Sequence, residues 1–271
     1  MMRVMVAWYV MLFEPHKMVQ GGVAQRGHNP RGQSMAIRKV KLVKIGTLAF
    51  EAFEKPDPKV RLMKYFCGIG TGSNVTYIET DDRNIIVDTG FDYEDNVKGK
   101  NSETNQENLI NSLKHYQIAP EDIDSVFITH WHRDHFGNLD VFPDAEIMTH
   151  RAHHQLGFSC REIGDREEIV EGVMVLATPG HTEHHASLVL TLEDICQESG
   201  GFAGHSSVIK SPCIVVAGDA VVSHSYYMQN KFWDYNSDFF SKEHSVRSQQ
   251  TISTLADYII PGHGTVFYNT R

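Results

Sequence analysis

One short segment of the chain gathers most of its chemically useful side chains. Residues 129–135 read Thr-His-Trp-His-Arg-Asp-His and directly follow an apolar run typical of a strand. On an extended segment His130 and His132 can point the same way, whereas Asp134 and His135 lie further along and can face a second ion. Imidazole and carboxylate donors without a thiolate suit zinc, with iron and manganese as alternatives. The segment therefore predicts a metal site at the end of a strand.

Three later apolar runs also end in a residue that can bind a metal. The runs of residues 173–177, 214–217 and 258–260 lead into His181, Asp219 and His263. A Gly or Pro stands beside each of these residues, which allows a sharp turn and a close approach of the backbone to an ion. Each turn alone is a weak signal. Four such turns in this order indicate one composite metal centre.

With these motifs the sequence resembles the metallo-β-lactamase superfamily over residues 39–263. The segments 73–78 and 84–90 look like the paired strands and the Asp-x-Gly turn that precede the metal motif in that family. The resemblance implies an α+β fold, a four-layer αββα sandwich with the metals at the edge of the sheets. It also implies that Asp88 orients the site and is not itself a ligand.

The resemblance further implies two metal ions per chain, Zn²⁺ first, with Fe or Mn as alternatives. The implied ligands are His130, His132 and His181 for the first ion, Asp134, His135 and His263 for the second, and Asp219 as a bridge. A hydroxide shared by the ions would attack an acyl carbon or a phosphorus atom, and Asp134 would shuttle the proton. Iron-dependent persulfide dioxygenases keep one ion behind similar motifs, so a mononuclear site stays open. The expected activity is that of a metal-dependent hydrolase.

Among the branches of the family, N-acyl homoserine lactone lactonases are the preferred resemblance, which implies a small ester or lactone substrate. It rests on the ligand motif, on the segment 178–182 and on an ending soon after the last ligand. Those lactonases place a substrate-binding Tyr three residues beyond the bridging Asp, where this chain has Val222. Tyr226, Tyr227 or His224 are the candidates to replace it. The aromatic segment 226–240 is a candidate wall for an acyl chain.

Other functions remain as alternatives. Glyoxalase II-like thioesterases share the ligands but usually add a C-terminal helical region, and only eight residues follow His263 here. True β-lactamases lack the Asp bridge, although promiscuous β-lactam hydrolysis fits the same chemistry. Phosphodiesterases and ribonucleases use these ligands with an Asp bridge and typically need added binding segments. A metal-binding sensor or partner-binding module without catalysis is the alternative from another class.

Composition adds broad limits. The 271 residues carry a formal net charge of −9, so there is no bulk attraction to nucleic acid, although a local basic patch would suffice. Four scattered Cys favour a reducing compartment, and a cytoplasmic location is expected. No apolar run reaches about 18 residues, so no membrane partner is expected. The expected partner is a small-molecule substrate. A homodimer is also considered, with the loop 193–211 near its surface or at the site entrance.

The elements that must position these residues follow from periodicity and turn signals. Residues 1–34 are interpreted as a peripheral N-terminal extension and residues 35–271 as the catalytic domain. The pattern predicts strands at 38–48 and 62–67 and helices at 105–115, 150–155 and 241–256. The adjacent pairs His153-His154 and His184-His185 are not expected to chelate one ion, because neighbouring side chains diverge.

Overall fold

The computed structural model describes residues 37–48, 72–92, 102–153, 156–192 and 212–271. All of them belong to one of the two units into which the chain divides, Ser34–Arg271. The expected N-terminal extension, the strand at 62–67 and the loop at 193–211 lie outside the described residues.

The first half of the described chain forms a six-stranded sheet in sequential order, β1-β2-β3-β4-β5-β6. Its strands are β1 (Ile37–Lys44), β2 (Val75–Thr80), β3 (Asn84–Val87), β4 (Ser125–Ile128), β5 (Glu146–Thr149) and β6 (Arg161–Glu162). The first three strands pair antiparallel, whereas β3 to β6 pair parallel. Parallel pairing brings the carboxyl ends of β3 and β4 to the same edge of the sheet.

The second half forms another six-stranded sheet, in the order β12-β11-β10-β9-β8-β7. Its strands are β7 (Glu168–Val170), β8 (Val173–Ala177), β9 (Ala186–Thr191), β10 (Cys213–Gly218), β11 (Tyr258–Pro261) and β12 (Phe267–Tyr268). Here β10 and β11 pair parallel and the remaining neighbours pair antiparallel. The carboxyl ends of β10 and β11 therefore share one edge, as those of β3 and β4 do in the first sheet.

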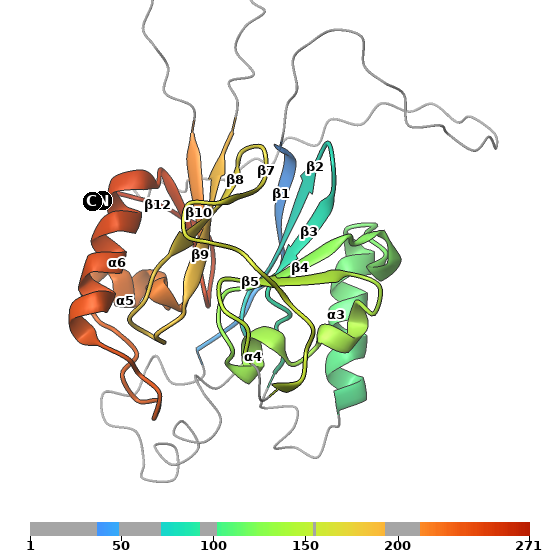
Figure 1. The fold of residues 1–271 in the computed structure, drawn as a ribbon, viewed down its shortest axis with the longest axis horizontal. Coiled ribbons are helices and arrows are strands. Elements are labelled where there is room, and N and C mark those ends of the chain that lie inside the picture. The colour runs from blue at the N-terminus through green and yellow to red at the C-terminus, as the bar shows by residue number, and fades with distance from the viewer. Residues whose placement is uncertain (1–36, 49–71, 93–101, 154–155, 193–211) are drawn as a thin grey trace, which may run out of the picture. The chain divides into compact units, whose positions relative to one another are not determined.

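The two sheets pack face to face, and helices cover their outer faces (Figure 1). The inner core joins buried apolar side chains of both sheets, among them Ile78, Phe127, Leu188 and Val216. Helix α3 (Ser102–His115) packs Leu109 and Leu113 on the outer face of the first sheet. Helix α6 (Lys242–Leu255) packs Ile252 on the outer face of the second sheet. The predicted αββα sandwich is confirmed.

Shorter helices line the turns between these elements. They are η1 (Pro120–Asp122), α4 (Arg133–Phe136), η2 (Leu139–Val141), η4 (Asp219–Val221) and α5 (His224–Met228). None of the helices described is both long and apolar enough to cross a membrane.

The predicted helices meet different outcomes. The helix expected at 241–256 is α6, whose N-terminus is capped by the Ser241 side chain accepting from the His244 N–H. The helix expected at 105–115 is α3, which begins three residues earlier. The helix expected at 150–155 is absent from its described part, residues 150–153. There the Ala152 N–H donates to the Glu162 carboxylate at 3.0 Å and the Arg151 carbonyl accepts from the Trp131 side chain at 2.9 Å, so these residues are held by contacts outside the segment.

Candidate metal centre

The ligand-bearing turns follow strands that are buried on both faces. All four residues of β4 are buried, because Phe127 faces the inner core while Val126 and Ile128 face α3. Such continuous apolar runs are typical of strands covered on both sides. The chain can turn only where β4 ends, which places His130 at the carboxyl edge of the sheet.

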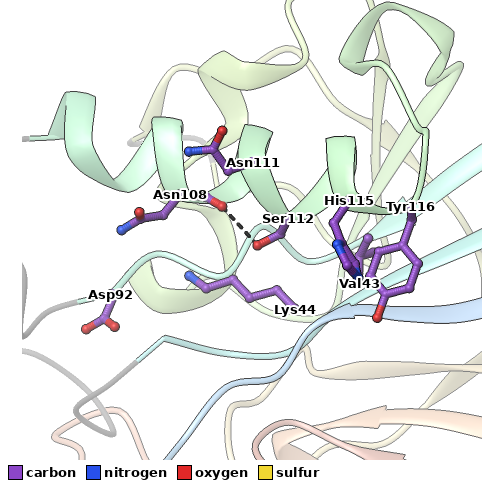
Figure 2. Close-up of a pocket in the computed structure, with 8 residues that line it drawn as sticks. All are labelled: Val43, Lys44, Asp92, Asn108, Asn111, Ser112, His115 and Tyr116. Atoms are coloured by element: carbon purple, nitrogen blue, oxygen red, sulfur yellow. Dashed lines mark hydrogen bonds between the residues drawn. The ribbon is translucent and has the colours of Figure 1, made fainter.

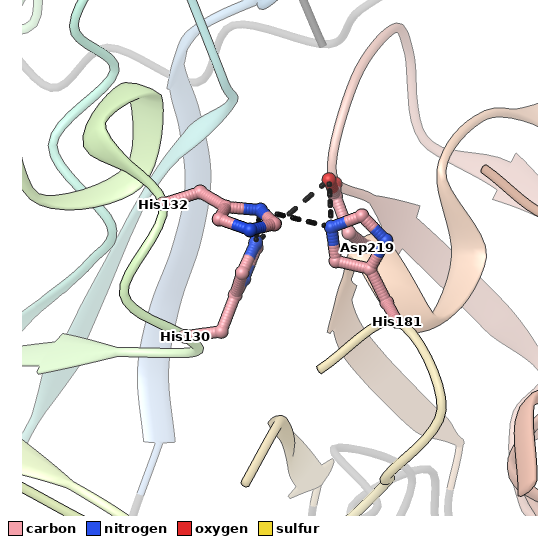
Figure 3. Close-up of side chains that lie close together, drawn as sticks. All are labelled: His130, His132, His181 and Asp219. Atoms are coloured by element: carbon pink, nitrogen blue, oxygen red, sulfur yellow. Dashed lines mark hydrogen bonds and ion pairs between the residues drawn. The ribbon is translucent and has the colours of Figure 1, made fainter. Parts of the chain in front are cut away.

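Four side chains from both halves of the chain meet in a first cluster (Figure 3). The His132 Nδ1 lies 2.9 Å from the His130 Nε2 and 3.0 Å from the His181 Nε2. The Asp219 Oδ2 lies 3.3 Å from the His181 Nε2. One donor atom from each residue thus points into a common space, and the four donor atoms lie within 4.8 Å of one another.

A second cluster lies beside the first and joins Asp134, His135 and His263. The Asp134 Oδ2 lies 3.7 Å from the His135 Nε2 and 3.6 Å from the His263 Nε2. The Asp219 Oδ1 faces this cluster, at 3.5 Å from the His135 Nε2 and 3.4 Å from the His263 Nε2. The two oxygens of one carboxylate therefore face two different sets of imidazoles.

The inward-facing polar atoms of the two clusters are buried, and several have no hydrogen-bond partner among the described residues. They include both carboxylate oxygens of Asp134 and of Asp219, the His135 Nε2 and the His263 Nε2. A buried polar atom without a partner costs about 1–3 kcal/mol. Nitrogen and oxygen donors that converge in this way fit divalent metal ions, which would satisfy them.

Burial and neighbouring charges set the ionisation of the cluster. Burial and the repulsion of the other imidazoles hold the pKa of His130 well below its ordinary value. Burial lowers the pKa of His181 to about 3, against the opposing charge of Asp219. Burial also acts to raise the pKa of the Asp219 carboxyl, but the imidazoles of His135 and His263 outweigh it and hold that pKa well below its usual range. His135 differs, because burial acts to lower its pKa but the carboxylates of Asp88, Asp134 and Asp219 outweigh it and raise that pKa well above its ordinary value. Neutral imidazoles such as His130 and His181 and an ionised carboxylate such as Asp219 are the forms that bind metals.

Asp88 orients the second cluster from behind. Its Oδ2 lies 2.7 Å from the His135 Nδ1, which leaves the Nε2 of that ring directed at the cluster. Its carboxylate also accepts from the backbone N–H and the hydroxyl of Thr129. The Thr129 hydroxyl in turn lies 3.1 Å from the His130 Nδ1. Asp88 adopts a left-handed φ of +58°, unusual for a residue with a side chain. Its contacts match the orienting role that the resemblance implies.

A buried chain of hydrogen bonds holds the turn that carries Asp219. The Ala220 N–H donates to the His185 Nε2 at 3.3 Å, so the proton of that ring must sit on Nδ1, which lies 2.9 Å from the Thr178 hydroxyl. Thr178 continues to the Ser187 hydroxyl at 2.8 Å, which donates to the Ala217 carbonyl at 3.1 Å. The chain therefore fixes the backbone on both sides of Asp219.

Gly218 makes this close packing feasible. It has a φ of +49°, a conformation that costs a residue with a side chain energy. A Cβ at this position would stand 2.8 Å from the Thr129 hydroxyl and 2.9 Å from the His185 Nε2. Gly218 therefore lets the turn before Asp219 lie against the residues that support both halves of the site.

The three candidate substrate contacts, Tyr226, Tyr227 and His224, lie in different surroundings. Tyr227 is fully buried in the core under α6, and its hydroxyl donates to the Asn269 side chain at 3.0 Å. It cannot touch a substrate in this conformation. His224 is exposed and its ring packs against Phe267 of β12. Tyr227 is therefore not placed to replace the lactonase Tyr, whereas His224 stays a candidate that makes no contact with the two clusters among the described residues.

Tyr226 is linked to the metal centre through Trp233 and Asn236. It packs with Trp233 against Val222, the residue that occupies the position of the lactonase Tyr. The Trp233 Nε1 donates to the Asn236 side chain, whose amide nitrogen lies 3.2 Å from the His132 Nε2. Of the three candidates, Tyr226 is thus the one connected to the ligands.

Sequence reasoning missed one carboxylate at the centre, Asp238. Its Oδ2 lies 2.9 Å from the His132 Nε2. Partial burial acts to raise the pKa of Asp238, but the hydrogen bond and charge of His132 outweigh it and hold that pKa below its ordinary value. No spacing rule could have found this contact, because Asp238 lies in an irregular segment 106 residues away from His132.

A separate hollow of about 520 Å³ lies between β1 and α3 (Figure 2). Its lining is largely polar and includes Lys44, Asp92, Asn108 and His115. None of its lining residues belongs to the two clusters. The Lys44 ammonium contacts the Gly90 carbonyl, so its charge is already engaged.

Comparison with known proteins finds the same family that the sequence motifs resemble. Residues 68–196 match the sequence model of the metallo-beta-lactamase superfamily, and this stretch contains both the His130 segment and His181. The metallo-beta-lactamase domain-containing protein 1 of Xenopus laevis is 32% identical over 60% of this chain and 63% of its own length. An N-acyl homoserine lactonase of a Bacillus species is 30% identical over 43% of this chain and 57% of its own length. Each alignment spans less than two thirds of the relative.

The fold extends the likeness over most of the chain. The crystal structure of a quorum-quenching N-acyl homoserine lactone lactonase superposes with a TM-score of 0.54 at 19% identity. The superposition covers 85% of this chain and 94% of the other. At this identity the match speaks for the fold alone. The matched sequence model, the curated relatives and the shared two-sheet fold agree, and the chain is similar to members of the metallo-beta-lactamase superfamily.

Proposed function

We propose that residues 35–271 form a hydrolase domain that binds two divalent ions, zinc first, and cleaves a small ester or lactone. The observation that carries the proposal is the placement of Asp219. Its Oδ2 faces His181 at 3.3 Å while its Oδ1 faces His263 at 3.4 Å. A carboxylate whose two oxygens face separate imidazole sets suits a bridge between two ions. The first ion would be held by His130, His132 and His181, and the second by Asp134, His135 and His263.

The chemistry divides between the ions and the protein. When bound, the ions would polarise the substrate oxygen and lower the pKa of water from about 15.7 to about 7. Asp134 can receive the proton of the attacking water, because neither of its buried oxygens has a hydrogen-bond partner among the described residues. It would then return the proton to the leaving oxygen as the carbon–oxygen bond breaks. The chain needs no covalent nucleophile for this reaction.

The ester or lactone class rests on two observations. Relatives named as N-acyl homoserine lactonases align with the chain. In addition, Tyr226 and the exposed Tyr235 and Phe240 lie on the segments that follow Asp219, where they could line the path of an acyl chain. Tyr226 would donate to the substrate carbonyl. The acyl-wall idea predicts faster hydrolysis of long-chain than of short-chain lactones, and equal rates would refute it.

The test compares three substrates on protein reconstituted with two equivalents of zinc. The substrates are an acyl homoserine lactone, a chromogenic β-lactam and a bis-aryl phosphodiester, with His132→Ala as the background. A preference for the lactone supports the proposal, and a preference for the phosphodiester moves the chain to the nuclease side of the superfamily. Activity on none of the three, with two ions bound, would refute the substrate class.

A matched pair of variants tests the Tyr assignment. Tyr226→Phe should lower kcat/KM on the lactone about tenfold through the loss of one hydrogen bond to the substrate. Tyr227→Phe should leave kcat/KM unchanged and lower only the free energy of unfolding, because its hydroxyl bonds Asn269 in the core. The reverse result would show that Tyr227 leaves the core during turnover.

A further inference from the structure

We propose that Asp238 is a positioning residue of the metal centre, which selects the tautomer of His132 that presents Nδ1 to the first ion. The inference rests on the proposed metal centre, but not on the proposed substrate. It assigns a role to a segment that lies outside the four ligand-bearing turns.

The two nitrogens of the His132 ring face different partners. The Nδ1 faces the cluster, at 2.9 Å from the His130 Nε2 and 3.0 Å from the His181 Nε2. The Nε2 faces Asp238, at 2.9 Å from Oδ2 and 3.1 Å from Oδ1. The ring is thus held between the ion position on one side and a carboxylate on the other.

The contact determines where the ring proton sits. An ionised carboxylate accepts hydrogen bonds and cannot donate them, so the Nε2 of His132 must carry the proton. The Nδ1 of the neutral ring then keeps a free lone pair, which is the form that binds a metal. A carboxylate on the far nitrogen of a ligating imidazole also fixes the ring orientation and raises its basicity.

The same arrangement occurs once in each cluster. His135 of the second cluster has Asp88 at 2.7 Å behind its Nδ1, and His132 of the first cluster has Asp238 at 2.9 Å behind its Nε2. By contrast, the far ring nitrogens of His181 and His263 have no hydrogen-bond partner among the described residues. Each proposed ion would therefore have one imidazole supported by a carboxylate.

The two supporting carboxylates differ in their exposure. Asp88 is buried, with 4% of its surface exposed, whereas the Asp238 side chain is 57% exposed. Asp238 can therefore be removed without leaving a buried cavity. A substitution of Asp238 can therefore separate its role in orienting a ligand from a role in folding, which a substitution of the buried Asp88 cannot do.

Asn236 holds the segment of Asp238 in place. Its side-chain oxygen accepts from the Trp233 Nε1 at 3.2 Å, and Trp233 is buried against Tyr226 and Val222. Its amide nitrogen lies 3.3 and 3.2 Å from the two nitrogens of the His132 ring, farther from each than the 2.9 Å between the His132 Nε2 and the Asp238 Oδ2. The position of Asp238 is therefore coupled to the aromatic residues proposed to line the acyl chain.

The experiment compares Asp238→Ala and Asp238→Asn with the control Asp234→Ala. Asp234 lies four residues earlier, is exposed, and has no hydrogen bond or ion pair among the described residues, so its removal changes the net charge equally. Zinc affinity is measured by competition with a chromophoric chelator. The tautomer of His132 is read from two-bond proton–nitrogen correlations in ¹⁵N-labelled, metal-free protein, because zinc on Nδ1 would by itself keep the proton on Nε2.

Loss of such a supporting carboxylate typically lowers metal affinity about 10–100-fold. Because Asp238 is largely exposed, we expect a loss of about tenfold for the first ion in Asp238→Ala. A smaller loss is expected in Asp238→Asn, which keeps a neutral acceptor. The wild-type ring should show the proton on Nε2, and the Ala variant should lose this preference in the metal-free protein. Asp234→Ala should change neither measurement.

Several results would overturn the inference. Unchanged zinc affinity together with an unchanged tautomer in Asp238→Ala would do so, and so would an equal loss in Asp234→Ala. If Asp238→Ala does not fold, zinc affinity and the His132 tautomer are measured in Asp238→Asn instead, and no change in either would overturn the inference. Wild-type protein that binds no divalent ion would refute both the inference and the proposed function. Two bound ions, the expected shifts and no lactone hydrolysis would support the inference and refute only the substrate.

Discussion

Replacement of Gly262 by Ala tests whether the position of Asp219 decides the second ion. Gly262 stands between β11 and His263, and a Cβ at this position would lie 1.9 Å from the Asp219 Oδ1. Carbon and oxygen do not approach below about 3.0 Å, so the oxygen would have to move by about 1.1 Å. The backbone of Gly262 is not left-handed, which means that the missing space alone should oppose the change.

The displaced oxygen is the one that faces the second cluster. It lies 3.4 Å from the His263 Nε2 and 3.5 Å from the His135 Nε2, whereas Oδ2 faces His181. Moving Oδ1 should weaken the second ion more than the first. A displacement of about 1 Å at a reacting centre can cost roughly a hundredfold in rate. We therefore expect about one zinc per chain in place of two, and kcat/KM lower by about a hundredfold or more.

Gly264→Ala is the matched control. Gly264 belongs to the same turn and has a φ of +90°, but no atom lies within 4 Å of its Cβ position. The variant should lower the free energy of unfolding by about 1–2 kcal/mol through backbone strain and should keep both ions. Zinc is counted by mass spectrometry after gel filtration, and rates are measured on the same samples. Gly262→Ala protein with two ions and wild-type kcat/KM would refute the reasoning.

Three further perturbations test the stability of the domain and its dependence on metal and pH. His185→Ala removes the partner of the Ala220 N–H and of the Thr178 hydroxyl, so urea unfolding should show a loss of about 2–4 kcal/mol; an unchanged midpoint would argue against this clamp. Chelation should lower the melting temperature, because an ion present at a hundred times its Kd contributes about 2.7 kcal/mol, or roughly 5–10 °C for a domain of this size; calorimetry with and without chelator checks this. Burial, reinforced by Glu79, raises the pKa of Tyr77 from 10.0 to about 12, so stability present below pH 10 should be lost as pH rises towards 12. Tyr77→Phe should lack this alkaline loss in unfolding measured at pH 9 and 12.

The sequence predicts the parts of the fold and site that local pattern determines. The runs before His130, Asp219 and His263 are β4, β10 and β11, buried on both faces as their unbroken apolar character indicates. Because strand ends place the following residue at the sheet edge, the spacing of the motifs is enough to predict that these side chains meet. The cap residue Ser241 likewise marks the start of α6.

The remaining features depend on contacts between distant segments. Tyr226 and Tyr227 are neighbours in α5, and adjacent side chains on a helix diverge by about 100°, so one packs with Trp233 and the other enters the core. Only the packing of α5 against β12 determines which of the two tyrosines enters the core. Asp238 is invisible to pattern analysis for a similar reason, since its partner His132 belongs to the opposite half of the chain. The helix wrongly expected at 150–155 is likewise replaced by a contact with a distant residue, because the Ala152 N–H donates to the Glu162 carboxylate.

Both halves of the chain contribute side chains to each of the two clusters, which would couple metal binding to the packing of the sandwich. Asn74 of the first half ties the two halves at the site: its side chain donates to the Pro261 and Gly264 carbonyls at 2.7 and 2.8 Å. Its backbone N–H donates to the Gly262 carbonyl at 2.7 Å. The turn that carries His263 is therefore held by the first sheet, although β11 belongs to the second. An ion bound by Asp134 and His263 would bridge the same junction. Its binding free energy would thus oppose separation of the sheets, so stability and ligand geometry cannot be tuned independently at this edge.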